Sequence, residues 1–386
     1  MDRTNAQKNI CLVYEFLSEQ GGLEREIITH ARFLQEAGYK VTILTCHLDP
    51  KILTLLPFDG LTIKTISRFK TPYEWLNLAL CFLGFNTLKN YHPDAFLTYS
   101  FPSNFLLRRR NTPRINYINH YPHFLYLSPE EKKEWAAGTQ GVKRAISLWI
   151  ARILGPYLRA VDKRLVKTNK LNFMNSLFTQ KNLEKLYHVR SIVSYPPLDK
   201  RFSSPPQPQK SKPFIFSSSR IIPDKKYEWL LDAMSHMKHK LPLHLAGSVQ
   251  PEYQDSLERL AKTKKVELKF LGRLKTEEIM QTYANATVFA FPTPGEDFGL
   301  VPAESLACGT PVVVWGDGAG PTEQIIDGIN GYWAKPYDRK EFAAKIDKII
   351  DTKLKQKNRK KIIASAEKFS YRSIRDKFIE DVRKVA

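Results

Sequence analysis

Residues 291–331 hold the side chains in this sequence that are best suited to bind a charged ligand. The stretch begins with a predicted buried strand that ends at Phe291. A loop rich in proline and glycine follows, and it presents Glu296, Asp297, Phe298 and Gly299. We expect a helix to start near Pro302, because proline suits a first helical turn, where its missing amide would be unpaired. The first amides of this helix, with those of Gly299 and Leu300, are placed to bind an anion.

Two carboxylates accompany this anion-binding helix start. Glu296 lies in the loop, and Glu304 is expected in the first helical turn. Carboxylates are unusual in a site for phosphate alone, but they accept hydrogen bonds from neighbouring hydroxyl groups. The stretch therefore indicates a ligand that carries both phosphate and hydroxyl groups, as a nucleotide-sugar does.

The elements that must position this site alternate between strands and helices. β-branched and aromatic runs predict strands at 9–14, 41–45, 62–66, 95–98, 115–119 and 164–168 in the first half. The same pattern predicts strands at 214–217, 243–246, 267–271, 288–291 and 312–315 in the second half. Helical patterns lie between them, and the tail from 340 to 385 is helical throughout. This alternation predicts an α/β protein of parallel sheets covered by helices.

A proline-rich stretch divides the alternation into two halves. Six prolines lie between residues 196 and 213, and they cannot continue a helix or a central strand, so we expect a linker there. The predicted domains are residues 1–199 and 200–370, with a further helix at 371–386. Open α/β sheets bind ligands at the carboxyl ends of their strands. We therefore expect a ligand in a cleft between the domains, with the GDGAGP loop at 316–321 facing it.

The composition fits a cytoplasmic globular protein with anionic partners. The 386 residues suffice for two or three domains. The 60 basic and 39 acidic residues give a net charge of +21, which indicates nucleic acid, an anionic membrane or phosphorylated substrates as partners. The four cysteines form no CxxC pattern, so we expect reduced thiols rather than disulfides or a zinc site. No run has the length expected for a signal-peptide core or a membrane-spanning helix.

The order of the site residues resembles the donor site of glycosyltransferase family 4. Glu296 is followed after seven residues by Glu304, Phe298 and Gly299 stand between them, and the helix reads ESLACGTPVV. The resemblance implies a GT-B fold, in which two Rossmann-like domains face each other across a cleft and the C-terminal helix crosses back to the first domain. It also implies sugar transfer with retention of anomeric configuration. The resemblance covers most of the second domain strongly and the first domain loosely.

Two further motifs match the positions where this family binds the donor diphosphate. Arg220 and Lys225 lie in SSSRIIPDKK after a predicted strand, and an arginine fork with a lysine point charge suits phosphate oxygens. Lys226 stands where the family often has glycine, a departure that would alter the helix start. Gly21 and Gly22 follow the first strand and resemble the glycine loop that closes over the donor, because paired glycines let backbone amides approach a phosphate.

The resemblance also implies roles for the remaining site residues. His120, at the end of a predicted strand, resembles the family's histidine near the transferred sugar. Glu304 would accept the ribose hydroxyls and Glu296 the sugar hydroxyls. The expected donor-binding set is Gly21, Gly22, Arg220, Lys225, Glu296, Phe298, Gly299, Leu300 and Glu304, and the expected catalytic set is His120, Glu296, Arg220 and Lys225. No DxD triplet occurs, which favours a metal-independent enzyme with no cofactor beyond its GDP- or UDP-hexose donor.

Basic residues gather between 142 and 170, where eight lysines and arginines accompany one acid. Apolar residues recur among them at helical spacing, which is typical of an amphipathic helix at a membrane interface. We expect docking on an anionic membrane through Lys143, Arg144, Trp149, Arg152 and Arg159. Residues 75–85 and 108–110 add apolar and basic surface to the same domain. The alternative is a core-facing stripe with a solvated basic face.

The sequence as a whole predicts a peripheral membrane glycosyltransferase. The expected reaction moves a hexose, with mannose favoured by the EDFGLVP form, to a glycan or lipid-linked acceptor. Two alternatives belong to other classes: a GT-B nucleotide-sugar epimerase, and a basic protein that binds membranes or nucleic acid without catalysis. No nucleic-acid-binding motif accompanies the charge, so nucleic acid is not an expected partner.

Overall fold

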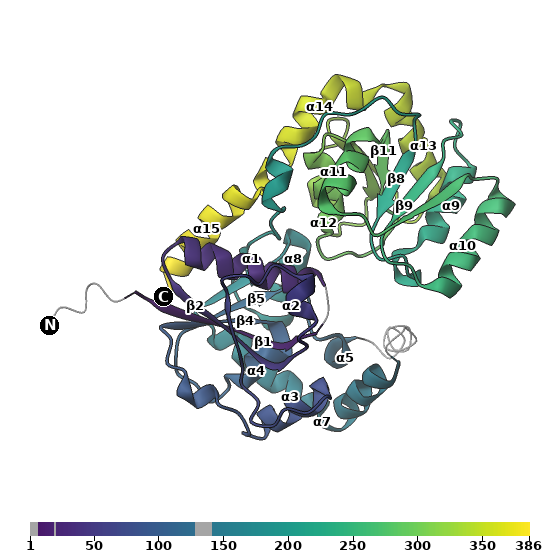
Figure 1. Ribbon diagram of the computed structural model, residues 1–386. Helices are drawn as coiled ribbons and strands as arrows, with labels where there is room; N and C mark the ends of the chain where they lie inside the picture. Colours follow the sequence, from purple (N-terminus) through teal and green to yellow (C-terminus); the bar gives the residue numbers. More distant parts are fainter. Residues whose placement is uncertain (1–6, 19–20, 128–140) are drawn as a thin grey trace. The chain divides into compact units, whose positions relative to one another are not determined.

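The computed structural model describes residues 7–18, 21–127 and 141–386. The chain forms two compact units (Figure 1). Unit 1 comprises residues 1–175, 179–194 and 375–386, and unit 2 comprises residues 176–178 and 195–374. Each unit is built on one parallel sheet with helices around it, as the alternating pattern predicts.

Unit 1 contains a seven-stranded sheet in the order β3-β2-β1-β4-β5-β6-β7. The strands are β1 (Asn9–Leu17), β2 (Lys40–Leu48), β3 (Thr62–Thr65), β4 (Ala95–Tyr99), β5 (Arg114–Ile118), β6 (Leu171–Met174) and β7 (Ile192–Val193). The helices are α1 (Gly22–Glu36), α2 (Ile52–Leu55), α3 (Glu74–Phe82), α4 (Ser100–Leu106), α5 (His123–Tyr126), α7 (Gly141–Thr168), α8 (Leu177–Tyr187) and the end of α15 (Tyr371–Arg383). Central strands such as β1 are buried along most of their length, which explains their unbroken apolar runs.

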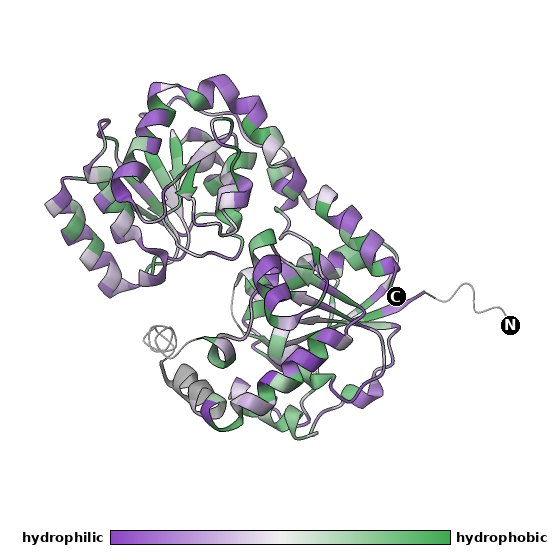
Figure 2. Cartoon of the chain, turned by 180° about the vertical axis from the view of Figure 1, so that it is seen from behind, coloured by the Kyte–Doolittle hydropathy of each residue, from purple (hydrophilic) through white to green (hydrophobic). Residues whose placement is uncertain are grey.

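Unit 2 contains a six-stranded sheet in the order β10-β9-β8-β11-β12-β13. The strands are β8 (Ile215–Ser218), β9 (Leu243–Ala246), β10 (Leu268–Gly272), β11 (Val288–Ala290), β12 (Val312–Trp315) and β13 (Gly331–Ala334). The helices are α9 (Tyr227–Ser235), α10 (Pro251–Lys264), α11 (Thr276–Asn285), α12 (Leu300–Ala307), α13 (Arg339–Asp351) and α14 (Leu354–Ser365), with short turns η3 (Lys200–Ser203), η4 (Pro223–Lys225), η5 (Thr322–Gln324) and η6 (Glu367–Phe369). Figure 2 shows hydrophobic strands inside both units and more polar residues on the helices.

The strand order places the site of unit 2. The order of the strands reverses between β8 and β11, and loops at such a reversal part and leave room for a ligand at the carboxyl ends. Arg220 follows β8, and the loop with Glu296 follows β11. The two predicted groups of ligand-binding residues therefore leave neighbouring strands at the same edge of the sheet.

The structure corrects one predicted strand. Residues 164–168 form the last turn of α7, and the sixth strand is β6 at Leu171–Met174. Leu158, Val161 and Leu165 are buried at helical spacing, so the β-branched run continues a helical face that packs on the core. The short strands β7 and β13 were not predicted.

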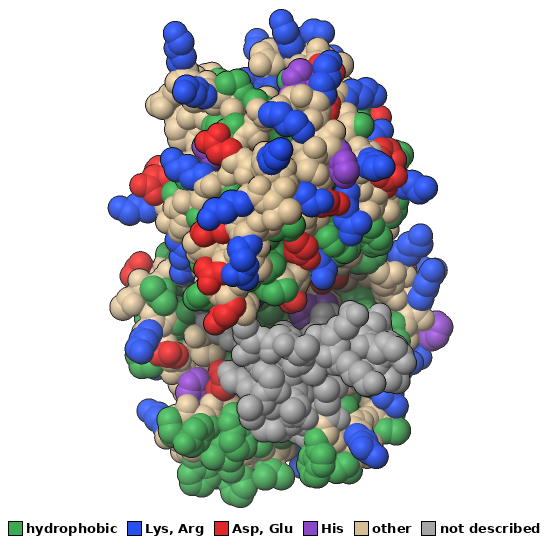
Figure 3. Space-filling view, turned by 90° about the vertical axis from the view of Figure 1, so that its right-hand side faces the viewer, with side chains coloured by type: hydrophobic (Ala, Val, Ile, Leu, Met, Phe, Trp, Pro, Cys, Tyr) green, Lys and Arg blue, Asp and Glu red, His purple; other side chains and the backbone are tan. Residues whose placement is uncertain are grey.

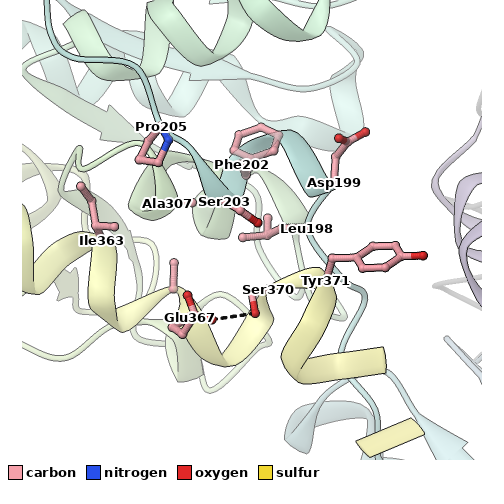
Figure 4. A pocket seen from close by; sticks show the side chains of 11 residues that line it. Leu198, Asp199, Phe202, Ser203, Pro205, Ala307, Ile363, Glu367, Ser370 and Tyr371 are labelled. Carbon is pink, nitrogen blue, oxygen red and sulfur yellow. Dashed lines mark hydrogen bonds between the residues drawn. The ribbon is translucent and has the colours of Figure 1, made fainter. Parts of the chain in front are cut away.

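The proline-rich stretch after residue 195 packs against unit 2 rather than forming a free linker. Phe202 in η3 is buried, the Leu198 amide donates to the Phe369 carbonyl at 2.9 Å, and Lys200 lies over the ring of Tyr371. Figure 4 shows the small hollow of about 50 Å³ beside these residues. The stretch is thus an ordered strap on the side of unit 2.

Two further predictions concern membrane-spanning helices and the state of the four cysteines. None of the described helices combines the length and the apolar character needed to cross a bilayer. The four cysteines are buried and free.

Candidate functional site

Lys225 and Glu296 form the centre of the site in unit 2. The Lys225 Nζ donates to the Glu296 Oε2 at 2.6 Å, and both side chains are largely buried. Lys225 ends η4 after β8, and Glu296 lies in the loop after β11, so the ion pair joins the two neighbouring strand ends. Arg220 is exposed at the end of β8. The sequence-predicted cations and one predicted carboxylate therefore lie on adjacent loops.

The residues that follow Phe291 are fastened by the GDGAGP loop. The Gly295 amide donates to the Asp317 Oδ2 at 3.0 Å, and the Gly320 amide donates to the Glu296 carbonyl at 2.9 Å. A Cβ on Gly320 would lie 2.2 Å from the Asp297 carbonyl oxygen, so only glycine permits this close approach of the two loops. The GDGAGP loop thus holds the loop that carries Glu296.

Gln324 fixes the peptide groups next to the start of α12. Its Nε2 donates to the carbonyl oxygens of Phe298 at 2.7 Å and Gly299 at 2.9 Å, and the side chain is buried. The Phe298 ring is buried against the rings of Tyr195 and Phe369. The aromatic contacts and the amide side chain together set the backbone where the anion-binding amides were predicted.

The start of α12 differs in detail from the prediction. The helix begins at Leu300, with Gly299 before it at φ 73°, a left-handed conformation that glycine adopts at least cost. Pro302 lies within the first turn, whereas Glu304 lies in the second turn, because the helix starts two residues earlier than expected. Glu304 therefore sits beyond the first amides rather than among them.

The Glu304 carboxylate is held by a buried phenol. The Tyr283 hydroxyl of α11 donates to the Glu304 Oε2 at 2.9 Å and lies 2.7 Å from the Ser218 Oγ at the end of β8. Tyr283 is completely buried, and burial with the nearby Glu304 charge raises the pKa of its hydroxyl well above the usual range. This phenol remains a hydrogen-bond donor at any physiological pH.

Asp297 is the second acid of the loop, and it lies beside the ion pair. The pKa of Asp297 is raised to about 7, chiefly by loss of solvation and also by the Glu296 charge, while the Lys225 charge opposes these effects. A substantial fraction of Asp297 is therefore neutral near neutral pH, where an anionic ligand would meet less repulsion.

The predicted residues of unit 1 lie at the carboxyl edge of its own sheet. Gly22 begins α1, and the Gly21 amide donates to the Glu24 Oε2 at 3.1 Å. His120 is exposed after β5, and its Nδ1 lies 3.2 Å from the Tyr121 carbonyl oxygen. The neighbouring Asn119 donates to the buried Glu26 at 3.2 Å, which ties the His120 loop to α1.

The predicted docking residues of α7 differ from one another in exposure. Trp149 is 65% exposed and Arg152 is exposed, as a docking surface requires. Arg159 is half-buried and donates to the Leu125 carbonyl at 3.1 Å, so its charge also supports α5. The side chains of Lys143 and Arg144 lie outside the described residues.

Several residues of the unit 2 site were missed by the sequence reasoning. No local sequence pattern indicates the roles of Tyr283, Gln324 and Ser218, because a buried tyrosine or glutamine in a helical pattern is ordinarily interpreted as a core residue. Asp317 and Gly320 carried a signal, since they belong to the GDGAGP loop that was expected near the ligand. In the described part of the chain, no group of three His, Cys, Asp or Glu side chains is arranged to hold a metal ion.

Comparison with known families matches the part of the chain that contains this site. Residues 199–369 match the model of the family described as glycosyl transferases group 1. The match includes Arg220, Lys225, the 292–299 loop and α12.

Individual relatives match shorter segments. A segment of 146 residues is 33% identical to an uncharacterized glycosyltransferase of Methanocaldococcus jannaschii and covers 37% of each chain. A segment of 119 residues is 36% identical to the GDP-mannose-dependent monoacylated alpha-(1-6)-phosphatidylinositol monomannoside mannosyltransferase of Corynebacterium glutamicum, and covers 28% of this chain and 31% of that protein. The likeness thus spans about a third of the length of these curated relatives.

Solved structures resemble the whole chain in fold. Anabaena HepE, crystallised in complex with UDP, superposes with a TM-score of 0.74 at 19% identity, covering 98% of this chain and 100% of that one. The two parallel sheets and this likeness give the chain the GT-B fold.

Proposed function

Because residues 199–369 match the model of group 1 glycosyl transferases and the chain has the GT-B fold, we propose that it is a retaining hexosyltransferase. The donor is a nucleotide-diphospho-hexose, and the acceptor is a glycan, most simply one linked to lipid. The observation that carries the proposal is the bridged pair of Lys225 and Glu296 beside the start of α12. Cation, carboxylate and helix amides meet there within unit 2, and this combination suits phosphate next to sugar hydroxyls.

In this proposal the residues of unit 2 divide the donor between them. Arg220 and Lys225 bind the diphosphate with the amides of Gly299 and Leu300, and Glu296 binds hydroxyls of the transferred sugar. Glu304 accepts the ribose hydroxyls. These cations and amides stabilise the charge that grows on the departing diphosphate, so their effect is largest in the transition state.

The resemblance to the family supports the remaining steps of the reaction. The acceptor hydroxyl attacks the anomeric carbon on the face from which the diphosphate departs, and the departing phosphate takes the acceptor proton. His120 and the amides of Gly21 and Gly22 act from unit 1 on the sugar and the diphosphate. With these groups supplying the positive charge, the proposed reaction needs no metal.

The identity of the hexose and the place of the reaction also belong to the proposal. GDP-mannose is the first donor to test, since the relative from Corynebacterium glutamicum is named for it, and UDP-glucose is the second, since HepE was also crystallised with it. The basic face of α7, with exposed Trp149 and Arg152, supports docking on an anionic membrane where a lipid-linked acceptor would lie.

Thermal stabilisation by nucleotides tests the donor site. The full chain is heated with GDP, UDP, ADP and their hexose conjugates in the presence of EDTA, for wild type and Glu304→Ala. Glu258→Ala, an exposed acid in the middle of α10, is the matched control. We expect one nucleotide to raise the melting temperature in EDTA, and Glu304→Ala alone to weaken that shift. The absence of a shift with any nucleotide would refute the donor site.

Transfer itself is then tested with the selected nucleotide-sugar and a lipid-linked acceptor. A product that keeps the anomeric configuration of the donor is expected. Interconversion of the nucleotide-sugar without transfer would show an epimerase instead.

A further inference from the structure

Helix α3 in unit 1 has its polarity reversed with respect to a normal surface helix. Glu74 and Asn77 are the polar side chains of its sequence, EWLNLALCF. Asn77 is buried, and its Nδ2 lies 2.9 Å from the His47 Nδ1 and donates to the Thr71 carbonyl at the same distance. Glu74 accepts a hydrogen bond from the Ser18 hydroxyl at 2.7 Å. The polar groups of α3 are thus used by the fold of unit 1.

The outer face of α3 is apolar. Trp75 is 50% exposed, and Leu83, directly after the helix, is 75% exposed. Leu76, Ala79 and Leu80 lie between them at helical spacing and are partly exposed, while Leu78, Cys81 and Phe82 pack against the core. A surface helix ordinarily turns its apolar stripe toward the core and its polar side toward solvent. In α3 the side that carries Trp75 and Ala79 is apolar and faces outward.

Neighbouring segments extend this apolar face at both ends of the helix. Phe69 and Phe85 are exposed and pack against each other with ring centroids 5.7 Å apart, and Tyr73 and Trp75 form a second aromatic pair at 6.1 Å. We call the five exposed residues Phe69, Tyr73, Trp75, Leu83 and Phe85 the α3 ridge.

The C-terminal end of α3 and one face of α7 pack against the same apolar cluster of unit 1. Phe82 packs in one cluster with Ala151 and Leu158 of α7, and Arg108 donates to the Phe82 carbonyl at 2.6 Å. On the described part of α7, the exposed large apolar residues are Trp149, Ile153, Leu154 and Tyr157. Hydrophobic side chains gather at the lower edge of the space-filling view, in the region where Figure 1 places α3 and α7 (Figure 3).

Basic side chains accompany this apolar surface. Arg68 and Lys70 are exposed on either side of Phe69, Arg109 is exposed after α4, and Arg152 is exposed on α7. Exposed aromatic and aliphatic groups with a basic rim match the boundary of an anionic bilayer, where rings enter the headgroup layer and cations meet phosphate.

We propose that the α3 ridge is a hydrophobic insertion element that enters the acyl boundary of an anionic membrane, next to the electrostatic contact made by α7. This inference rests on the proposed membrane docking and deepens it, because it names a second element with a different physical basis. Contact through α7 charges weakens with salt, since ions screen it. Contact through the α3 ridge depends on buried apolar area and persists at high salt.

Binding of the full chain to phospholipid vesicles tests the inference. Vesicles of phosphatidylcholine with phosphatidylglycerol are sedimented with wild type, with the double variant Trp75→Ser and Leu83→Ser, and with Arg152→Ser. The matched control is Trp333→Ser with Ile326→Ser, which removes a similar exposed pair from unit 2. We expect the α3 double variant to lower partitioning about 100-fold at both low and high salt. Arg152→Ser should lower it only at low salt, and the unit 2 pair should leave it unchanged.

A second measurement reports the depth of insertion at a single position of the α3 ridge. Leu83→Cys is labelled with a polarity-sensitive dye, which is selective because the four native cysteines are buried. A blue shift on adding vesicles is expected at position 83, and no shift at a Trp333→Cys control.

The outcomes separate this inference from the wider proposal. Vesicle binding that is abolished by salt and unaffected by the α3 double variant would overturn the inference and leave α7 docking in place. A change of oligomeric state in that variant, without a change in partitioning, would make the ridge a protein interface and also overturn the inference. Nucleotide stabilisation is measured apart from vesicles, so failure of the donor site is recognised independently.

Discussion

Units 1 and 2 share a parallel-sheet plan, but they hold their predicted site residues in different ways. In unit 2, Lys225 pairs with Glu296, and Glu304 is bound to Tyr283. One of these bonds joins the loops after β8 and β11, and the other joins α11 to α12. In unit 1, the Gly21 amide bonds to Glu24, the His120 ring lies next to the Tyr121 carbonyl, and Asn119 joins the His120 loop to Glu26 of α1. We infer that unit 2 can bind a donor with its own residues, whereas the predicted residues of unit 1 act mainly on turnover.

Replacing Lys225 gives the largest expected effect on this comparison. Lys225→Ala removes the buried partner of Glu296 and a cation that we propose binds the diphosphate, so both donor binding and transfer should fall. Transfer should drop by about 10²–10³-fold, the range found when one preorganised group that stabilises transition-state charge is deleted. The assays are nucleotide titration by calorimetry and sugar transfer. Lys262→Ala, an exposed lysine on α10, should change neither value.

Replacing His120 tests the role of unit 1 in this comparison. His120→Ala should lower turnover by about 10²-fold, in the range of a lost positioned acid, base or hydrogen-bonding group. Donor affinity should stay near the wild-type value, because the network of unit 2 is untouched. A parallel loss of nucleotide affinity would show that unit 1 also builds the donor site, and the contrast between the units would no longer hold.

The sequence predicts the positions of the site more fully than its internal bonding. The order β8–Arg220–Lys225 and the loop–helix unit around Glu296 follow from short runs with clear local signals, such as proline at the helix start. Tyr283 and Gln324 act through buried contacts between elements far apart in the chain, and a buried polar residue carries no local sign of its partner. The error at 164–168 has a similar cause, because packing of α7 overrode a β-branched run.

The α3 ridge shows a different limit of sequence reasoning. Residues 75–85 were predicted to add apolar surface to their domain. An apolar run alone does not indicate which side of its helix faces solvent. That required the contacts of Asn77 and Glu74, which turn the polar side of α3 inward. Orientation of a helix is a tertiary property, and periodicity cannot assign it when only two polar residues interrupt an apolar run.

Tyr283 tests whether the bonding inside unit 2 matters for the ligand. Tyr283→Phe removes the donor that holds the Glu304 carboxylate and leaves the buried Ser218 hydroxyl without its 2.7 Å partner. We expect nucleotide affinity to fall about tenfold, in line with about 1–3 kcal/mol for an unsatisfied buried group.

The specificity of that loss can be measured with deoxynucleotides. If Glu304 binds ribose hydroxyls, wild type should prefer the ribonucleotide, and Tyr283→Phe should reduce the preference. Tyr253→Phe is the control, since this phenol bonds to Glu228 and the Tyr227 amide on α9. An unchanged preference in Tyr283→Phe would reduce the phenol to a structural role.

For Asp297 we predict a smaller effect, which is a dependence of ligand affinity on pH. Its raised pKa of about 7 means that the carboxyl gains charge as the pH passes through neutrality. A bound diphosphate raises this pKa further, so the neutral form binds better and affinity should fall as the pH rises. The expected decrease is about threefold to fivefold between about pH 6 and about pH 8, equivalent to about one pKa unit of coupling or slightly less.

The measurement uses a nucleotide-sugar, whose phosphates do not take up a further proton in this range. Asp297→Asn should bind with little pH dependence and resemble the wild type at the acidic end. Asp317→Asn is the comparison variant, because Asp317 bonds to the loop through the Gly295 amide but is not the titrating group of this prediction. A wild-type affinity that rises with pH would contradict the assignment.

Lys226 gives the smallest expected effect, and it separates backbone conformation from ligand binding. Lys226 lies between η4 and α9 at φ 56°, a left-handed conformation that favours glycine. Lys226→Gly should therefore raise the free energy of unfolding by up to about 1 kcal/mol, reduced by loss of the contact between its Nζ and the Trp229 ring. Lys265→Gly, at φ 54° after α10, should give a similar gain in a thermal melt. Nucleotide affinity should change only in Lys226→Gly, because this residue follows Lys225 directly and its conformation sets where that cation lies. Equal affinities in the two variants would show that the ion pair with Glu296, rather than the turn, fixes the position of Lys225.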